Sequence, residues 1–285
     1  MTEEKDLTKN DAGYAKLEQK LGFDRIRKAI SARCSTEYAA GRVADEKFST
    51  SASEITKRLR LVDEMRLIMM FEESFPTNGY IDAIGFLRPL EKTSVSIDLL
   101  SLRKLKTILE TLRRLTAFFE DVKDGVYPNL KRMASGIMNF TEVQRRIDGI
   151  LDKYSEVKDT ASDELYSIRK SLRDKEGTIS KRINLILRRA KEEGLVDGDA
   201  TVTMRDGKML IPVQAANKKK LSGFIYDESA SGKTTYIEPA EVVELDNEIR
   251  ELRFAEQREI VRILYEFTEF LRPYIPELLD AAVFI

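Results

Sequence analysis

The sequence predicts a mainly α-helical protein, with a helical core domain and a long antiparallel coiled-coil arm that carries a small four-stranded antiparallel β-sheet. Three observations predict this class. Apolar residues recur at helical spacing over most of the chain, whereas residues 200–238 have the alternation and turn residues of strands. Gly and Pro number only 14 and 7 among 285 residues, and 34% of the residues are charged. That composition is typical of long solvated helices around an apolar seam.

The N-terminal part is expected to form the helical core domain. Residues 1–12 are polar and predict a disordered tail, and residues 13–140 contain most of the helical stripes. Ser53 is expected to cap one helix, and another is expected from about 101 to 121. The apolar stripes should pack into a core rather than bind a ligand. They include Leu17, Leu21, Ile26, Ile30, Ile55, Leu59, Val62, Met65, Met69 and Met70.

Residues 141–194 are expected to form the outgoing helix of the arm. The chain lacks proline from 141 to 193, and apolar residues from Val143 through Tyr154 to Ala190 step mostly by three and four. Unbroken, this helix would extend roughly 80 Å at 1.5 Å per residue. The seam slips beside Gly177, which is the expected point of flexure.

Residues 195–240 are expected to form the sheet. Asp206-Gly207 is a two-residue hairpin turn between the first two strands, and further strands are expected near 221–227 and 233–238. Pro212 predicts an edge strand or a bulge. Residues 241–272 predict the returning helix, which is shorter and should pair with the distal half of the outgoing one. Residues 273–285 would begin a return to the core, and their apolar end suggests a piece of a longer protein.

Ser231-Gly232-Lys233-Thr234 resembles the end of a phosphate-binding loop. The pattern requires a glycine where this chain has Asp227, and a helix must follow the lysine. Here strand-forming residues follow, and Pro239 would stop a helix. The segment is therefore expected to be a turn between strands.

The residue supply excludes several kinds of catalysis within the chain. Histidine is absent, and the one cysteine, Cys34, is expected to be a small core residue. A Cys/His zinc site and Ser-His-Asp or Cys-His catalysis are thereby excluded. We expect no catalytic residue, cofactor site or metal site in this chain. A signal-peptide apolar region and an apolar run of about 20 residues are both missing, so a soluble, cytoplasmic protein is expected.

Three motifs carry a resemblance to a known family. They are R-x-G-x-x-x-I-P-V at 205–213, G-x-x-x-D-x-S-x-S-G-x-T at 223–234 and I-E-P-x-x-V-V-E-L-x-N-E at 237–248. Together they resemble the clamp and lever region of the MutS family, in its bacterial type-2 branch. The similarity extends over most of residues 15–285. The resemblance implies that the arm is a lever and the sheet a clamp, in an N-terminal core, lever and clamp fragment.

The resemblance also implies what the rest of such a protein would do. Family members carry an ATPase domain, which uses ATP and Mg²⁺, and this branch usually has a C-terminal endonuclease. They dimerise through the ATPase, encircle DNA in mismatch repair or recombination control, and in some bacteria act on collided ribosomes and their rRNA. The implied partners are mismatched, branched or duplex DNA, the ribosome and a second copy of the protein, and not a membrane.

Basic residues near the expected sheet are the candidates for nucleic-acid contact. The chain as a whole has a net charge of −1, so any binding patch must be local. Phosphate contacts need only Lys and Arg, and they do not read sequence. The predicted contacts are Lys218, Lys219, Lys220, Arg205, Lys208, Arg188 and Arg189. Two functions stay open: an arm that binds DNA without sequence preference, or a structural strut or protein-docking arm whose charges only keep it soluble.

Overall fold

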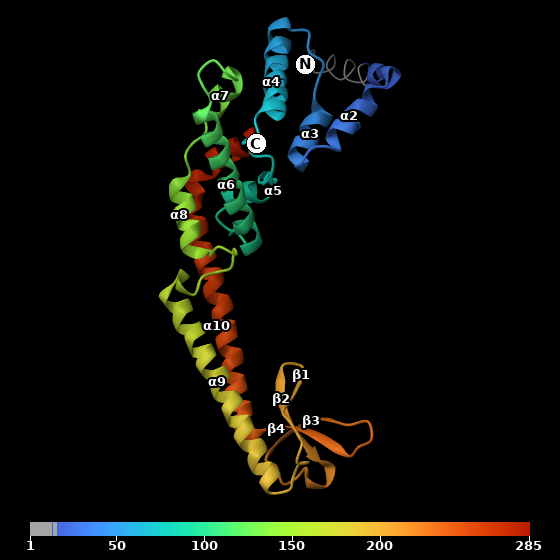
Figure 1. The fold of residues 1–285 in the computed structure, drawn as a ribbon, viewed down its shortest axis with the longest axis vertical. Helices are drawn as coiled ribbons and strands as arrows, with labels where there is room; N and C mark the ends of the chain where they lie inside the picture. Colours follow the sequence, from blue (N-terminus) through green and yellow to red (C-terminus); the bar gives the residue numbers. More distant parts are fainter. Residues whose placement is uncertain (1–12, 14–15) are drawn as a thin grey trace, which may run out of the picture. The chain divides into compact units, whose positions relative to one another are not determined.

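The computed structural model describes residue 13 and residues 16–285, and it is mainly helical with one four-stranded antiparallel sheet (Figure 1). The chain divides into two compact units. One ends at Asp148 and also contains Leu264–Ile285, and the other is Gly149–Ile263. The tail predicted over residues 1–12 lies outside the described residues. None of the described helices has both the length and the apolar character that crossing a membrane requires.

The described part of the first unit contains helices and turns. Its elements are α2 (Phe23–Ser31), α3 (Glu37–Asp45), α4 (Ala52–Phe71), α5 (Ile84–Leu87), η1 (Arg88–Glu91), α6 (Leu99–Asp121), α7 (Pro128–Ala134), most of α8 (Thr141–Ile150), the end of α10 (Ala240–Leu271), η4 (Arg272–Tyr274) and α11 (Ile275–Phe284). Helix α6 confirms the helix expected from about 101 to 121.

Helix α6 is central to the core of this unit. It begins where the Asp98 carboxylate accepts a hydrogen bond from the Ser101 N–H at 2.9 Å, an N-cap that satisfies one of the free amides of the first turn. Ten of its residues are buried, six of them leucine or isoleucine. At its C-terminal end Phe118 packs edge-on against Phe75 and Phe119, with ring centroids 5.2 and 5.1 Å apart.

Buried polar side chains join distant segments of the first unit. The Glu64 carboxylate accepts hydrogen bonds from the backbone N–H groups of Asn129 and Leu130, at 3.1 and 2.8 Å, at the N-terminus of α7. A negative charge there is favourable because it meets the positive end of the helix dipole. The Thr268 hydroxyl, which is fully buried, accepts from the Ile97 N–H at 2.9 Å. These contacts hold α4 to α7 and the end of α10 to the segment before α6.

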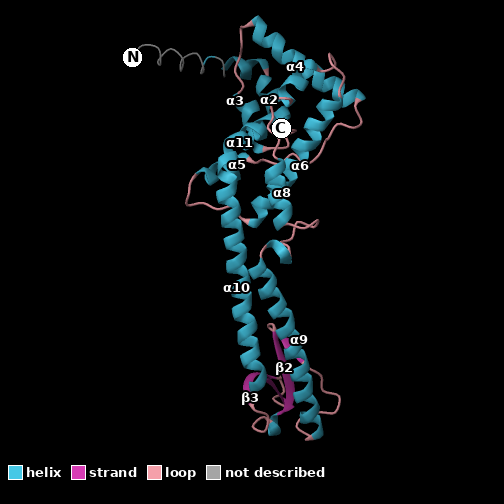
Figure 2. Cartoon of the chain, turned by 90° about the vertical axis from the view of Figure 1, so that its left-hand side faces the viewer, coloured by secondary structure: helices cyan, strands magenta, loops and turns pink. Residues whose placement is uncertain are grey.

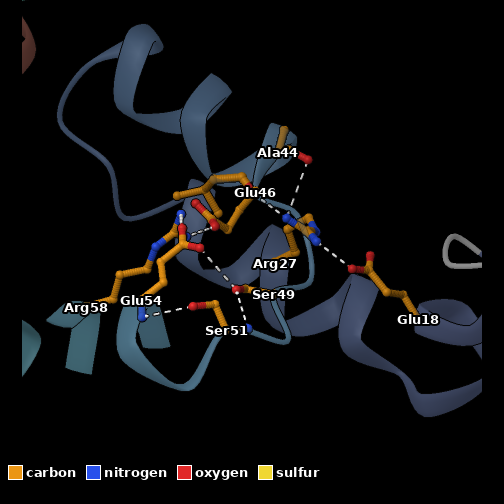
Figure 3. Close-up of polar contacts among 9 residues, drawn as sticks. Glu18, Arg27, Ala44, Glu46, Ser49, Ser51, Glu54 and Arg58 are labelled. Carbon is orange, nitrogen blue, oxygen red and sulfur yellow. Dashed lines mark hydrogen bonds and ion pairs between the residues drawn. The ribbon is translucent and has the colours of Figure 1, made fainter. Parts of the chain in front are cut away.

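The cap of α4 differs from the prediction. Ser51, not Ser53, precedes the helix, and its hydroxyl accepts from the Glu54 N–H at 3.4 Å (Figure 3). Ser53 lies inside the first turn, where its backbone is already helical and its hydroxyl meets that of Ser51 at 3.1 Å. Arg58 donates to the Glu54 carboxylate and also to Glu46, which joins α4 to the end of α3.

The N-terminal apolar stripes were predicted to be core, and this prediction is wrong for most of them. Ile68 is buried and Met65 packs partly buried against the aromatic cluster of α6, because this face of α4 looks toward α6 and α7. The remaining apolar side chains are exposed within the described chain: Leu17, Leu21, Ile26, Ile30, Ile55, Leu59, Val62, Met69 and Met70. Cys34 also differs from the prediction, because it lies partly exposed in the turn after α2.

The outgoing helix predicted over 141–194 is interrupted. Helix α8 ends at Ile150 and α9 (Asp163–Glu192) begins at Asp163. Between them the Asp152 carboxylate accepts from the N–H groups of Tyr154 and Glu156, at 2.8 and 2.9 Å. Ser155 takes a positive φ of 63°, and Tyr154 is exposed rather than part of a seam. An aspartate that bonds its own downstream amides competes with helix formation, which the apolar spacing alone does not reveal.

In the second unit the predicted strands are confirmed. They are β1 (Thr203–Arg205), β2 (Lys208–Gln214), β3 (Gly223–Glu228) and β4 (Thr234–Pro239), in the order β1-β2-β4-β3. Asp206 and Gly207 have φ of 47° and 80°, as a two-residue hairpin turn requires. Strand β1 pairs with β2 only as far as Leu210, so at Pro212 β2 is paired with β4 alone. Pro212 is thus at a local edge, as expected.

Helices α9 and α10 pack antiparallel in the second unit, with the strands beside one end of the pair (Figure 2). Ion pairs join Arg169 to Glu256 at 2.6 Å and Arg182 to Glu241 at 3.2 Å, so residue numbers fall on α10 as they rise on α9. Helix α9 continues through Gly177. The shared core contains side chains of both helices and of β2 and β4: Ile168, Leu172, Ile179, Ile183, Ile186, Leu187, Ala190, Ile211, Val213, Ile237, Val242 and Ile249.

Candidate nucleic-acid interface

Three of the predicted cations form ion pairs inside the second unit. Arg205 pairs with Asp227 and lies over the ring of Tyr236, 3.7 Å from its centroid. Lys208 pairs with the buried carboxylate of Glu238, on the neighbouring strand β4. Arg205 and Lys208 are therefore held by the sheet, and a phosphate would have to compete with these carboxylates.

Lys218 is also paired, but weakly held. Its Nζ lies 3.1 Å from the Glu228 carboxylate, and the two side chains are 39 and 48% exposed. Exposed pairs of this kind contribute little to stability, so Lys218 can exchange its partner at low cost.

The other predicted cations are unpaired within the described chain. Lys219, Lys220, Arg188 and Arg189 are all exposed and no carboxylate of the described residues lies within ion-pair distance of them. Lys219 and Lys220 lie in the turn that follows η3 (Ala215–Asn217), and the two arginines lie in the last two turns of α9.

Lys233 joins this group, although the sequence analysis treated it only as part of a rejected phosphate-binding loop. Its carbonyl oxygen accepts from the Ala215 N–H at 2.9 Å, which ties the β3–β4 hairpin to the loop that carries Lys219 and Lys220. The Lys233 side chain is exposed and unpaired within the described residues. A basic residue at a hairpin tip is the signal that could have identified it.

Two hydrogen bonds bring the end of α9 to the same loop. The Gln214 N–H donates to the Leu195 carbonyl at 3.3 Å, and the Asn217 side-chain amide donates to the Gly194 carbonyl at 3.3 Å. Arg189 lies three residues before Glu192, the last residue of α9, or about 4.5 Å along the helix axis at 1.5 Å per residue. We call Arg188, Arg189, Lys219, Lys220 and Lys233 the tip cations.

Acidic residues share this end of the unit. Glu192, Glu193, Asp197 and Asp199 are exposed there, and Asp197 accepts from the Gln214 side chain at 2.6 Å. The tip is therefore a local cluster of unpaired cations in mixed surroundings rather than a broad basic surface.

The turn that resembles a phosphate-binding loop is held by hydrogen bonds between its own residues. The Gly232 N–H donates to the Ser229 carbonyl at 2.8 Å, and the Thr234 N–H donates to the Ser229 hydroxyl at 3.1 Å. Gly232 has a φ of 66°, which glycine adopts readily. Strand β4 follows at once, so the expected turn between strands is confirmed.

One tyrosine on the sheet has a perturbed pKa. The Tyr226 hydroxyl donates to the Asp206 carboxylate at 2.6 Å, and this hydrogen bond raises the pKa of the phenol above its usual value. Tyr226 therefore stays neutral through the physiological range. Among the described residues, no three carboxylate or cysteine side chains gather into a group that could hold a metal ion.

The second unit thus belongs to the class of proteins in which an antiparallel helix pair carries a small sheet. The tip cations, which are unpaired within the described residues, lie beside that sheet. No family model matches the chain. Known proteins named endonuclease MutS2 do match it. The chain is 29% identical to the one from Alkaliphilus oremlandii over 88% of its length and 31% identical to the one from Thermomicrobium roseum over 91%. A putative endonuclease MutS2 from Bacillus subtilis is 29% identical over 90% of the chain.

These matches show that the chain is similar, over about nine tenths of its length, to proteins of the MutS2 type, as the three sequence motifs indicated. The chain spans about a third of the length of the curated relatives it matches: 32% for the Alkaliphilus protein and 33% for the other two.

Proposed function

We propose that this chain is the nucleic-acid-gripping region of a MutS2-type protein. In this proposal α9 and α10 form a coiled-coil lever, the four-stranded sheet is a clamp, and the tip cations contact phosphates of duplex, branched or mismatched DNA without sequence specificity. The observation that carries it is that hydrogen bonds join three segments of the second unit, each with exposed cations that are unpaired among the described residues.

Physical chemistry favours backbone contact over base readout at such a tip. Lys and Arg on flexible stems neutralise phosphates and release counterions, and they carry no base information. If all five tip cations engaged phosphates, the slope of log K against log salt would be roughly −4.5 on duplex DNA. The acidic neighbours of the tip make a smaller slope equally consistent with the proposal.

The whole protein's activity belongs to the same proposal. The relatives' names include the word endonuclease, and we propose that this chemistry, ATP and Mg²⁺ use, and the homodimer contact made through the ATPase domain belong to parts beyond this chain. The chain itself would bind nucleic acid and contribute no catalytic residue. We further propose a cytoplasmic protein whose ligand can also be structured rRNA on the ribosome.

A strut or docking arm is the second candidate function. The observation that favours it is the set of ion pairs that lock Arg205 and Lys208 into the sheet and thus remove them from phosphate contact. In this case the arm would hold other parts of the protein apart, and the tip cations would only keep it solvated.

Fluorescence anisotropy separates the two candidates. The chain is titrated into labelled duplex DNA, a four-way junction and an rRNA hairpin, from low to physiological salt. The test variant is Lys219→Glu/Lys220→Glu, and the control is Lys57→Glu/Arg60→Glu, which reverses two exposed cations of α4 that have no ion-pair partner among the described residues. Both variants change the net charge equally.

The proposal predicts salt-dependent binding that is much weaker in the test variant and unchanged in the control. The slope of log K against log salt should fall by roughly 2 in the test variant, because two phosphate contacts are removed. Equal losses in both variants would mean a general charge effect, and no binding at low salt would favour the strut.

A further inference from the structure

Strand β3 is an exposed edge of the clamp sheet. The strand order β1-β2-β4-β3 leaves one side of β3 without a neighbour, and all of its residues are exposed. Phe224, Ile225 and Tyr226 are 64, 53 and 38% exposed, although they are strong strand formers and apolar. Strand β3 and the turn that follows it extend away from α9 and α10 (Figure 1). An apolar edge strand of this kind is a template for pairing with another strand.

The apolar side chains of β3 are exposed on both faces of the sheet. Ile225 is opposite Ile237, on the face that packs against the helices, and Phe224 is opposite Glu238, on the other face. A ligand that covers one face of the sheet would leave the apolar side chains of β3 on the other face exposed to solvent. A strand added along the edge brings a cross-strand neighbour to both faces.

The charges that flank β3 select the partner. Lys219 and Lys220 precede the apolar residues, and Asp227 and Glu228 follow them. When two copies of this segment lie antiparallel, the basic start of each lies against the acidic end of the other. The segment is thus complementary to itself, and a two-fold pairing satisfies both ends at once.

The backbone fixes the register of such a pair. The Ser222 carbonyl accepts from the Ala240 N–H at 3.1 Å, so Ser222 directs its backbone groups toward the β4 side. Because these groups alternate along a strand, those of Gly223 and Ile225 face the open edge. The bulge between Ile225 and Asp227 ends this alternation. Pairing Gly223 with the partner's Ile225 therefore sets Phe224 against the partner's Phe224.

We propose that β3 pairs antiparallel with β3 of a second copy of this chain, joining two clamp sheets edge to edge with Phe224 at the two-fold axis. Beyond the paired residues, the basic turn that contains Lys220 in one copy comes near the acidic end of the partner's β3, which contains Glu228. The contact needs no nucleic acid and does not depend on the proposed DNA grip.

A cysteine trap tests the register. In a Cys34→Ser background, Phe224→Cys places two thiols at a non-hydrogen-bonded antiparallel pair, where Cα atoms are about 4.5 Å apart and a disulfide can form. Mild oxidation should give a disulfide-linked dimer. Met204→Cys in the same background is the control, because Met204 is 59% exposed on β1, away from this edge. Equal cross-linking of both variants, or none in either, overturns the proposal.

A charge exchange tests the partner without cysteine. Sedimentation equilibrium without nucleic acid should show a monomer–dimer equilibrium for the native chain. Lys220→Glu and Glu228→Lys should each weaken it at least tenfold, because each brings like charges near one another at both ends of the paired strands. The double variant should recover association to within about threefold of the native value. A native chain that stays monomeric, or a double variant as weak as the single ones, contradicts the proposal.

Discussion

Arg169 joins the segment that precedes α9 to α10, and its removal should loosen that segment. Its Nε lies 2.6 Å from the Glu256 carboxylate of α10. Its Nη1 lies 2.7 Å from both the Val157 carbonyl and the Asp159 carboxylate. The Arg169 side chain is 20% exposed, so these charge-assisted bonds are better shielded than those of surface pairs. One guanidinium thus joins α9, α10 and the segment between α8 and α9.

Arg169→Met keeps most of the side-chain volume and removes all of these bonds. A hydrogen bond to a charged group contributes roughly 1.5–3 kcal/mol when shielded and about 0–1 when exposed. Asp159 and Glu256 are 40 and 24% exposed, so both carboxylates can rehydrate. We therefore expect a loss of about 2 kcal/mol, which corresponds to roughly 30-fold.

Hydrogen exchange of the Lys158 amide is the assay. This N–H donates to the Ile150 carbonyl at 2.9 Å, inside the segment that Arg169 holds. Its exchange should become roughly 30-fold faster in Arg169→Met. Arg173→Met is the control, since Arg173 is 56% exposed and contacts the Asp159 carboxylate at 2.9 Å. Equal exchange in the two variants, or a change under about twofold in Arg169→Met, would refute this reasoning.

Four further substitutions have expected outcomes. Gly79→Ala should destabilise the chain by more than about 1 kcal/mol in urea unfolding, because the φ of Gly79 is 89° and the new Cβ would collide with a threonine of α6. Gly177→Ala should stabilise the chain by roughly 0.5–1 kcal/mol, because Gly177 lies within α9 and a Cβ there meets open space. Thr268→Val should cost about 1–3 kcal/mol by leaving the buried Ile97 N–H without an acceptor, which thermal unfolding measures. Hydrogen bonds from arginine lower the pKa of Asp159 in the folded chain. The contribution of Asp159 to stability is therefore present above its unfolded pKa of about 4 and is lost as the pH falls through the lower folded pKa. Acid unfolding, followed by circular dichroism, should be less steep in Asp159→Asn.

The sheet was predictable from the sequence because its signals are local. Asp206-Gly207 specifies a two-residue turn, and the strands on either side alternate as a half-buried sheet requires. Helix α6 was predictable for a similar reason, since its apolar stripe and its punctuation at both ends agree.

The interruption between α8 and α9 was not predictable from apolar spacing. Leu151 and Val157 are buried and form an isolated β-bridge between α8 and α9. Their apolar side chains therefore continue the apolar pattern of the sequence, although neither residue is helical. The side chain that makes the turn is Asp152, a polar residue that the periodicity ignores. Similarly, the stripe of α4 has the spacing of a core face, but burial depends on which elements lie beside it.

The tip could be predicted in part. Sequence identified Lys219, Lys220 and the two arginines by charge, but it could not distinguish them from Arg205 and Lys208, whose carboxylate partners come from other strands. Lys233 reaches the tip only through the backbone bond to Ala215. Pairing across a sheet decides which cations stay available, and that pairing is a property of the folded chain.

The most direct test of the proposed grip is lysine footprinting by mass spectrometry. The chain is reductively methylated at low salt with and without a saturating four-way-junction DNA, and the rate is read at each lysine. The account predicts that Lys219, Lys220 and Lys233 react several-fold more slowly with DNA, while Lys57 of α4 is unchanged. Equal rates at the three tip lysines with and without DNA would contradict it.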